Sequence, residues 1–131
     1  MVVDSSALLA AVFRDPGHLI LVDLPTSAEL VAAGSHTLPE TGIVLKARLG
    51  ATARGMVERI LAEFGIEEIL FGEGHWTGAA EAFRQLLKGR HPAGLNFGDC
   101  LTYSAPRRAG EPLPCLGDDF PRTDLELVAR A

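Results

Sequence analysis

Short apolar segments alternate along this chain with longer segments that have a helical pattern. The apolar segments cover residues 1–3, 29–33, 66–71 and 113–116. Strands that alternate with helices pair in parallel and are joined by right-handed crossovers. The sequence therefore predicts an α/β fold, a three-layer α/β/α sandwich with a short parallel sheet, formed as a single domain over residues 1–131.

The expected helices are recognised by apolar residues that recur every three to four positions. They cover residues 7–13, 37–49, 51–64, 76–87, and a last one from 95 or 97 to about 109. Ser5 or Ser6 is the expected N-cap of the first helix. The apolar residues of 37–49 suit a largely buried helix, and residues 117–131 end in a short helical pattern.

Composition and apolar run length exclude several classes of protein. The longest strongly apolar run, residues 18–24, is far shorter than the roughly 20 residues of a membrane span. Asp4 stands where a signal peptide needs positive charge. Cys100 and Cys115 lie too far apart for a CxxC pair and are expected to be reduced thiols. We therefore expect a cytoplasmic protein with no membrane association.

Acidic residues stand at the boundaries of several expected elements. Asp4 follows the first strand, and Asp118 and Asp119 follow the strand at 113–116. Glu40 and Asp99 lie in the first turns of two helices. Ligands of parallel sheets bind beyond the carboxyl ends of the strands, so the fold would gather these acids at one edge.

Several carboxylates in one pocket repel one another and raise one another's pKa values unless a cation is present. Mg²⁺ prefers oxygen ligands and is usually held by one or two carboxylates together with water. Each acid also has an ordinary structural role available. Glu40 and Asp99 fit helix-capping patterns, Asp4 fits an Asx turn, and Asp118 with Asp119 fits a solvated turn.

Four segments of the chain resemble the PIN-domain toxins of prokaryotic toxin–antitoxin pairs, the VapC group. They are MVVDSSALLA at the N-terminus, ETGIVLKARLG at 40–50, GRHPAGLNFGDC at 89–100, and GDDFPRTD at 117–124. The resemblance runs from residue 1 to about residue 125. It implies a Mg²⁺- or Mn²⁺-dependent endoribonuclease that is restrained by a cognate VapB-like antitoxin and that forms a homodimer.

Carried onto this sequence, the resemblance assigns catalytic roles to Asp4, Glu40, Asp99 and Asp119, with Asp4 and Asp99 holding the metal. Ser5 and Ser6 support the first acid, and Asp118 and Asp124 are further candidates for the fourth. The implied chemistry is in-line attack by metal-activated water on an RNA phosphodiester.

The formal net charge of −5 excludes a uniformly basic surface for nucleic acid. Phosphate contact must then come from a local cluster. The densest basic cluster in the chain consists of Arg84, Lys88, Arg90 and His91, and we expect it to contact RNA. A solvated helix end is the plainer interpretation of the same residues.

Two prolines depart from the family pattern. Pro106 falls inside the last long helix, where a proline kinks or ends the helix, and Pro114 interrupts the expected last strand. They motivate an alternative function, a catalytically weak PIN-fold module that acts mainly through antitoxin binding. A response-regulator receiver is disfavoured because neither lysine, Lys46 or Lys88, follows a late strand.

Overall fold

The computed structural model describes residues 1–16, 30–50, 53–87, 89, 91–110, 113–114 and 120–128. The strands in chain order are β1 (Val2–Val3), β2 (Val31–Gly34), β3 (Ile66–Ile69), β4 (Leu113–Pro114) and β5 (Leu127–Val128). The helices are α1 (Ser5–Phe13), α3 (Thr37–Leu49), α4 (Ala53–Phe64), α5 (Glu73–Leu86) and α6 (Phe97–Ala109). Alternation of the two element types is thus confirmed.

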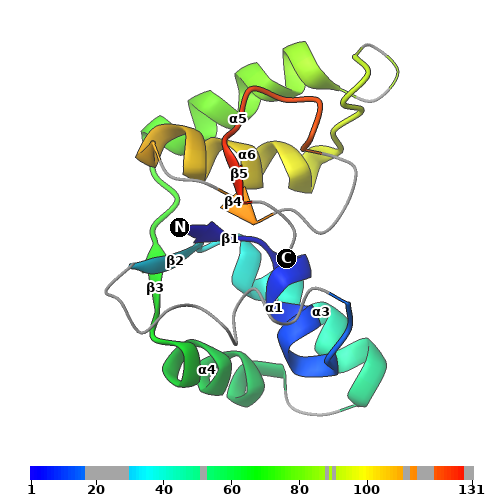
Figure 1. The fold of residues 1–131 in the computed structure, drawn as a ribbon, viewed down its shortest axis with the longest axis vertical. Coiled ribbons are helices and arrows are strands. Elements are labelled where there is room, and N and C mark those ends of the chain that lie inside the picture. The colour runs from blue at the N-terminus through cyan, green and yellow to red at the C-terminus, as the bar shows by residue number, and fades with distance from the viewer. Residues whose placement is uncertain are drawn as a thin grey trace.

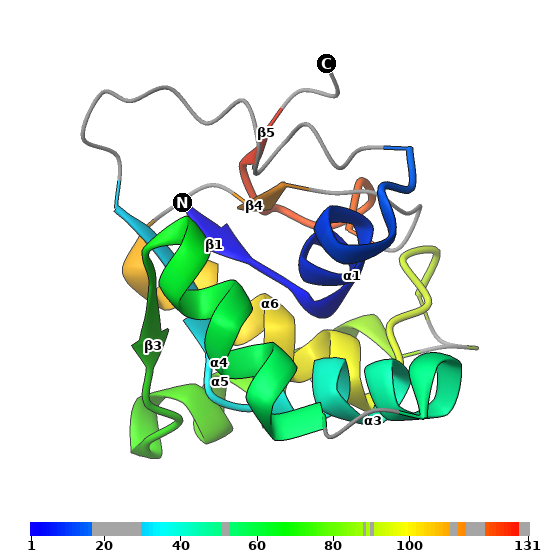
Figure 2. The same cartoon turned by 90° about the horizontal axis from the view of Figure 1, so that it is seen from below.

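The main sheet is parallel and has the strand order β1-β2-β3. Helices α1, α3 and α4 lie on one side of it, and α5 and α6 lie on the other (Figure 1). Viewed from the side of α4, that helix stands in front and α6 lies behind it (Figure 2). The expected three-layer α/β/α sandwich is confirmed.

Each side of the sheet has its own apolar core. The first packs the strands against α1, α3 and α4, and it includes Val3, Leu8, Leu45 and Ile60. The second packs α5 and α6 against the C-terminal segment, through Leu95, Cys100, Tyr103, Leu113 and Phe120. The sheet contributes Val3, Val31, Ala33 and Ile66 to the first core. Because its strands are parallel, all three end at one edge, where the loops into α1, α3 and α5 begin.

Several local expectations are wrong. The N-cap of α1 is Asp4 and not a serine, because the Asp4 carboxylate accepts the backbone N–H of Ala7. Helix α5 begins at Glu73, three residues earlier than expected. The tail forms strand β5 where a helical pattern was expected, and β5 pairs in parallel with β4.

Helix α3 is less buried than its composition predicts. Leu45 is fully buried, but Ile43 is 70% exposed and Leu49 is 48% exposed. Pro106 does not end α6, which continues to Ala109 and closes with Gly110 in the left-handed conformation. Within the described ranges, no helix is both long and apolar enough to cross a membrane.

Candidate active site

Asp4 stands where β1 ends and α1 begins. Its carboxylate accepts the Ala7 backbone N–H at 2.9 Å and the Ser6 hydroxyl at 2.8 Å to each oxygen. The residue is only 9% exposed, and this burial raises the pKa of the Asp4 carboxyl although the hydrogen bonds from Ala7 and Ser6 oppose the shift. A buried acid whose hydrogen bonds do not compensate its burial is a group that a cation would stabilise.

Glu40 lies in the first turn of α3. Burial raises the pKa of its carboxyl, and the charges of Asp4 and Asp99 raise it further, while a hydrogen bond from the Ser5 side chain lowers it. The helix has no side-chain cap at its N-cap residue, His36. The Glu40 side chain is thus hydrogen-bonded to Ser5, and the N-cap residue of α3 is His36 rather than the Thr37 of the capping pattern.

Asp99 lies in the first turn of α6, where it has a structural role as well. Its Oδ2 accepts the Asn96 backbone N–H, and Asn96 Oδ1 accepts the Asp99 backbone N–H, both at 2.9 Å. The capping interpretation of this residue is confirmed. A Cβ at the neighbouring Gly98 would lie 3.8 Å from Oε1 of Glu40, so Glu40 reaches the turn that carries Asp99.

The structure therefore places Glu40, at the start of α3, near both Asp4 and Asp99, which come from the starts of α1 and α6 and are far from it in the sequence. Among the described residues no three His, Cys, Asp or Glu side chains form a ready-made ligand group. Mg²⁺ commonly takes one or two protein carboxylates and completes its shell with water. The shared repulsion at Glu40 and the buried charge of Asp4 fit such a cation.

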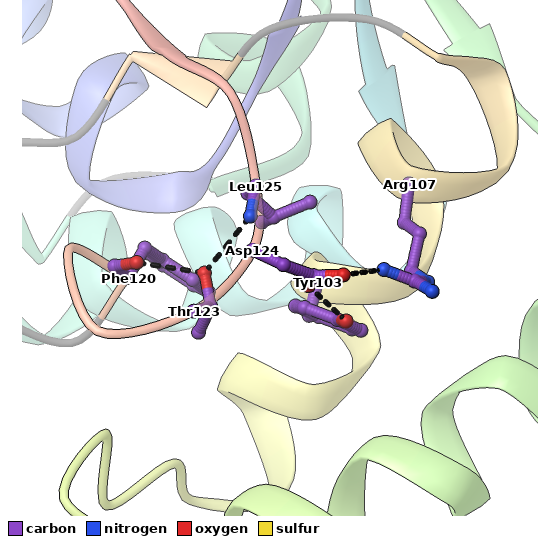
Figure 3. A network of polar contacts seen from close by, with 6 residues as sticks. All are labelled: Tyr103, Arg107, Phe120, Thr123, Asp124 and Leu125. Atoms are coloured by element: carbon purple, nitrogen blue, oxygen red, sulfur yellow. Dashed lines mark hydrogen bonds and ion pairs between the residues drawn. The ribbon is translucent and has the colours of Figure 1, made fainter.

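Asp118 and Asp119 lie outside the described residues, as do Lys88, Arg90 and Cys115. Asp124 is engaged elsewhere: it accepts the Tyr103 hydroxyl at 2.5 Å and forms an ion pair with Arg107, as Figure 3 shows. These contacts anchor the turn before β5 on α6.

The described members of the basic cluster have partners of their own. Arg84 forms an ion pair with Glu81 at 2.6 Å, one turn earlier in α5. Nδ1 of His91 accepts the Ala93 backbone N–H at 3.0 Å. Cys100 is a free, buried thiol, and burial and the neighbouring Asp99 raise its pKa.

Sequence reasoning missed His36, which has no local signal. Its Nε2 lies 3.2 Å from Oγ1 of Thr102, which is 66 positions away, and 3.3 Å from Oγ1 of Thr37. Burial, together with a smaller contribution from the charge of the neighbouring His75, lowers the pKa of His36 from 6.5 to about 4. The imidazole is therefore neutral at neutral pH.

This neutral histidine predicts an acid-sensitive fold. Between pH 6.5 and about 4 the unfolded chain binds a proton at His36 and the folded chain does not, so stability falls as the pH decreases through this window. We expect the wild type to lose roughly 2–3 kcal/mol more than His36→Gln over this range. Urea unfolding of both proteins at pH 7 and pH 4 measures the difference, and parallel losses would contradict the assignment.

Comparison with known proteins agrees with the fold. Residues 1–125 match the PIN domain family. The fold superposes on VapC20 of Mycobacterium tuberculosis, a sarcin–ricin loop cleaving toxin, with a TM-score of 0.75 and 19% identity over 97% of each chain. It also matches a chain of a toxin–antitoxin complex from Klebsiella pneumoniae, with a TM-score of 0.69 and 13% identity over 99% of this chain and 97% of that one.

Relatives with similar sequences identify the group of PIN-domain proteins to which the chain belongs. A VapC ribonuclease of Mycobacterium bovis and ribonuclease VapC36 of M. tuberculosis are each 41% identical over 127 residues, which cover 96% of this chain and 91% of theirs. The chain belongs to the VapC family of PIN-domain ribonuclease toxins.

Proposed function

We propose that this chain hydrolyses RNA phosphodiester bonds at the sheet edge where Asp4, Glu40 and Asp99 meet, with Mg²⁺ or Mn²⁺ held by Asp4 and Asp99. The observation that carries the proposal is the closeness of Glu40 to the other acids: its Oε1 lies 3.8 Å from where a Cβ at Gly98, next to Asp99, would be. Burial raises the pKa of the Glu40 carboxyl, and the charges of Asp4 and Asp99 raise it as well. Asp119 is the proposed fourth acid. Asp124 is a weaker candidate because Tyr103 and Arg107 already engage its two carboxylate oxygens.

The side chains have distinct tasks in this proposal. Glu40, with its raised pKa, suits accepting a proton from the attacking water at a carboxylate oxygen, and Ser5 orients it. Ser6 and the Ala7 N–H fix the direction of the Asp4 carboxylate. The bound cation would lower the pKa of coordinated water and stabilise charge on the phosphate oxygens. Arg84, Lys88, Arg90 and His91 remain the proposed RNA contacts.

The proposal predicts metal-dependent cleavage by the purified chain. RNA should be cut with Mg²⁺ or Mn²⁺, and not with EDTA, and the metal should also raise the thermal unfolding midpoint. Asp99→Asn keeps an oxygen for the Asn96 N–H and removes the charge, so it should lose both effects while staying folded. Cleavage that survives in Asp99→Asn would refute the site. A folded, metal-binding wild type without activity would favour the alternative, a module that acts through protein binding.

A groove between α3 and α4 supports the antitoxin as a partner. It has a volume of about 540 Å³ and is lined by apolar residues that include Leu38, Ile43, Val57 and Leu61, with Lys46, Glu58 and Glu68 also lining it. This pattern suits the apolar face of an amphipathic helix. We propose that a VapB-like antitoxin places such a helix in the groove and extends a basic side chain toward the acidic site.

Ile43→Arg should weaken antitoxin binding by at least about 10-fold, since it puts a charge into a desolvated apolar contact. Leu70→Arg is the matched control, because Leu70 is 73% exposed and does not line the groove. Calorimetry with the product of the adjacent upstream reading frame measures both affinities. Equal affinities in the two variants would rule out the groove.

Homodimer formation stays a prediction from the family resemblance. Analytical ultracentrifugation of the purified chain tests it.

A further inference from the structure

His36 sits at the junction between the sheet and the two helices that carry Glu40 and Asp99. It is the N-cap residue of α3 and follows β2 by two positions. Its Nε2 lies 3.2 Å from Oγ1 of Thr102 in α6. His36 precedes Glu40 by four residues and Thr102 follows Asp99 by three, so each member of the pair lies one helical turn from an acid.

The surroundings of the imidazole hold it in this place. The Phe71 ring contacts it edge to face, with ring centroids 5.7 Å apart. Thr102 is buried. The imidazole also folds over Gly34: a Cβ there would lie 2.5 Å from Cε1 and 2.7 Å from Nδ1 of His36. A side chain at position 34 would therefore displace the imidazole from its present position.

Packing alone does not account for a histidine at this position. Its Nδ1 is buried and has no hydrogen-bond partner among the described residues. A buried polar atom without a partner is costly, and an apolar side chain would avoid that cost. An apolar side chain could not supply the contacts of Nε2 with the hydroxyls of Thr102, at 3.2 Å, and Thr37, at 3.3 Å. Of the two, only the contact with Thr102 joins α3 to α6.

We propose that His36 is a positioning residue, which ties α3 to α6 through Thr102 and so holds Glu40 and Asp99 in one site. The inference rests on the proposed function of these acids. The tie acts through geometry and not through charge, since burial keeps the imidazole neutral at neutral pH. Losing the contact between His36 and Thr102 would move Glu40 and Asp99 apart and weaken the cation site. Neither His36 nor Thr102 would contact RNA itself.

Two matched pairs of variants test the tie. Thr102→Ser keeps the hydroxyl and Thr102→Val removes it at similar volume. His36→Gln keeps a polar group that can reach the Nε2 position, and His36→Leu does not. We expect Thr102→Val and His36→Leu to lower kcat by about 10-fold or more and to weaken Mn²⁺ binding to a similar extent, which is the usual effect of losing a group that orients metal ligands. KM for RNA should change less than twofold, and Thr102→Ser and His36→Gln should keep most of the activity.

Unfolding midpoints of all four variants separate positioning from stability. A purely structural tie would lower the midpoint and leave kcat and Mn²⁺ affinity of the folded protein unchanged, and that result would overturn the proposal. If Thr102→Val and His36→Leu do not fold, Gly34→Ala displaces the imidazole while keeping every polar group, and it should show the same loss of kcat.

Mn²⁺ calorimetry distinguishes failure of this inference from failure of the proposed function. If the wild type binds Mn²⁺ and does not cleave RNA, the ribonuclease proposal fails, and weaker Mn²⁺ binding by Thr102→Val than by Thr102→Ser still supports the tie. Equal binding by the two overturns it. A wild type that neither cleaves RNA nor binds Mn²⁺ overturns both.

Discussion

Asp4→Asn should abolish RNA cleavage and at the same time make the metal-free chain more stable at neutral pH. Asparagine is as good an N-cap as aspartate, so α1 keeps its hydrogen bond to the Ala7 N–H. The variant lacks the negative charge that would hold a cation. We expect activity to fall about 1000-fold, comparable to the loss of a group that stabilises the transition state directly.

The gain in stability follows from the raised pKa of Asp4. The folded chain binds a proton at this carboxyl more readily than the unfolded chain, whose pKa is near 3.8. The contribution of Asp4 to stability therefore falls as the pH rises from that value through the folded-state pKa, and the charge destabilises the fold above it. Asparagine carries no such charge, so the difference should be present at pH 7 and vanish below pH 3.8.

Urea unfolding in EDTA at pH 7 and pH 3.5, together with a cleavage assay in Mn²⁺, measures both effects. Asp15→Asn is the control, because Asp15 is exposed and forms an ion pair with Arg48 at 3.7 Å rather than facing the acids. It should keep full activity. If Asp4→Asn is less stable than the wild type in EDTA at pH 7, burial of the Asp4 charge is not the dominant effect of this side chain on the free energy of unfolding.

Leu45→Ala should destabilise the fold by about 2–5 kcal/mol, the cost of a cavity at a buried leucine. Leu45 is fully buried in the core between the sheet and α1, α3 and α4. Helix α3 also carries Glu40, so this cavity lies under the helix that delivers a catalytic side chain. Thermal and urea unfolding measure the loss.

Ile43→Ala, two residues earlier in the same helix, is the matched control. Ile43 is 70% exposed, so its loss should change stability by no more than about 0.5 kcal/mol. Equal losses of stability in the two variants would mean that α3 does not pack with Leu45 buried and Ile43 exposed. The pair also tests which face of α3 remains uncovered for a partner.

The positions of the helices were predictable because helical periodicity is a local property. The burial of individual residues in α3 was not predictable, since the sequence does not distinguish an apolar residue that is buried from one that stays exposed. Which face is covered depends on where β1, α1 and α4 pack. Ile43 is on the uncovered face, where it lines the groove between α3 and α4 and is 70% exposed. Strand β5 had no signal of its own because two residues form a strand only when β4 lies beside them.

The sequence by itself determined the alternation of strands and helices and the placing of Asp4, Glu40 and Asp99 at element boundaries. Parallel strands end at one edge, so these positions already implied a shared site. Only the tertiary structure decided which side chains serve that site. Asp124 pairs with residues 17 and 21 positions earlier, and His36 meets Thr102 across 66 positions. Contacts between residues so far apart in the sequence depend on how the helices pack, and helix packing leaves no local pattern in the sequence.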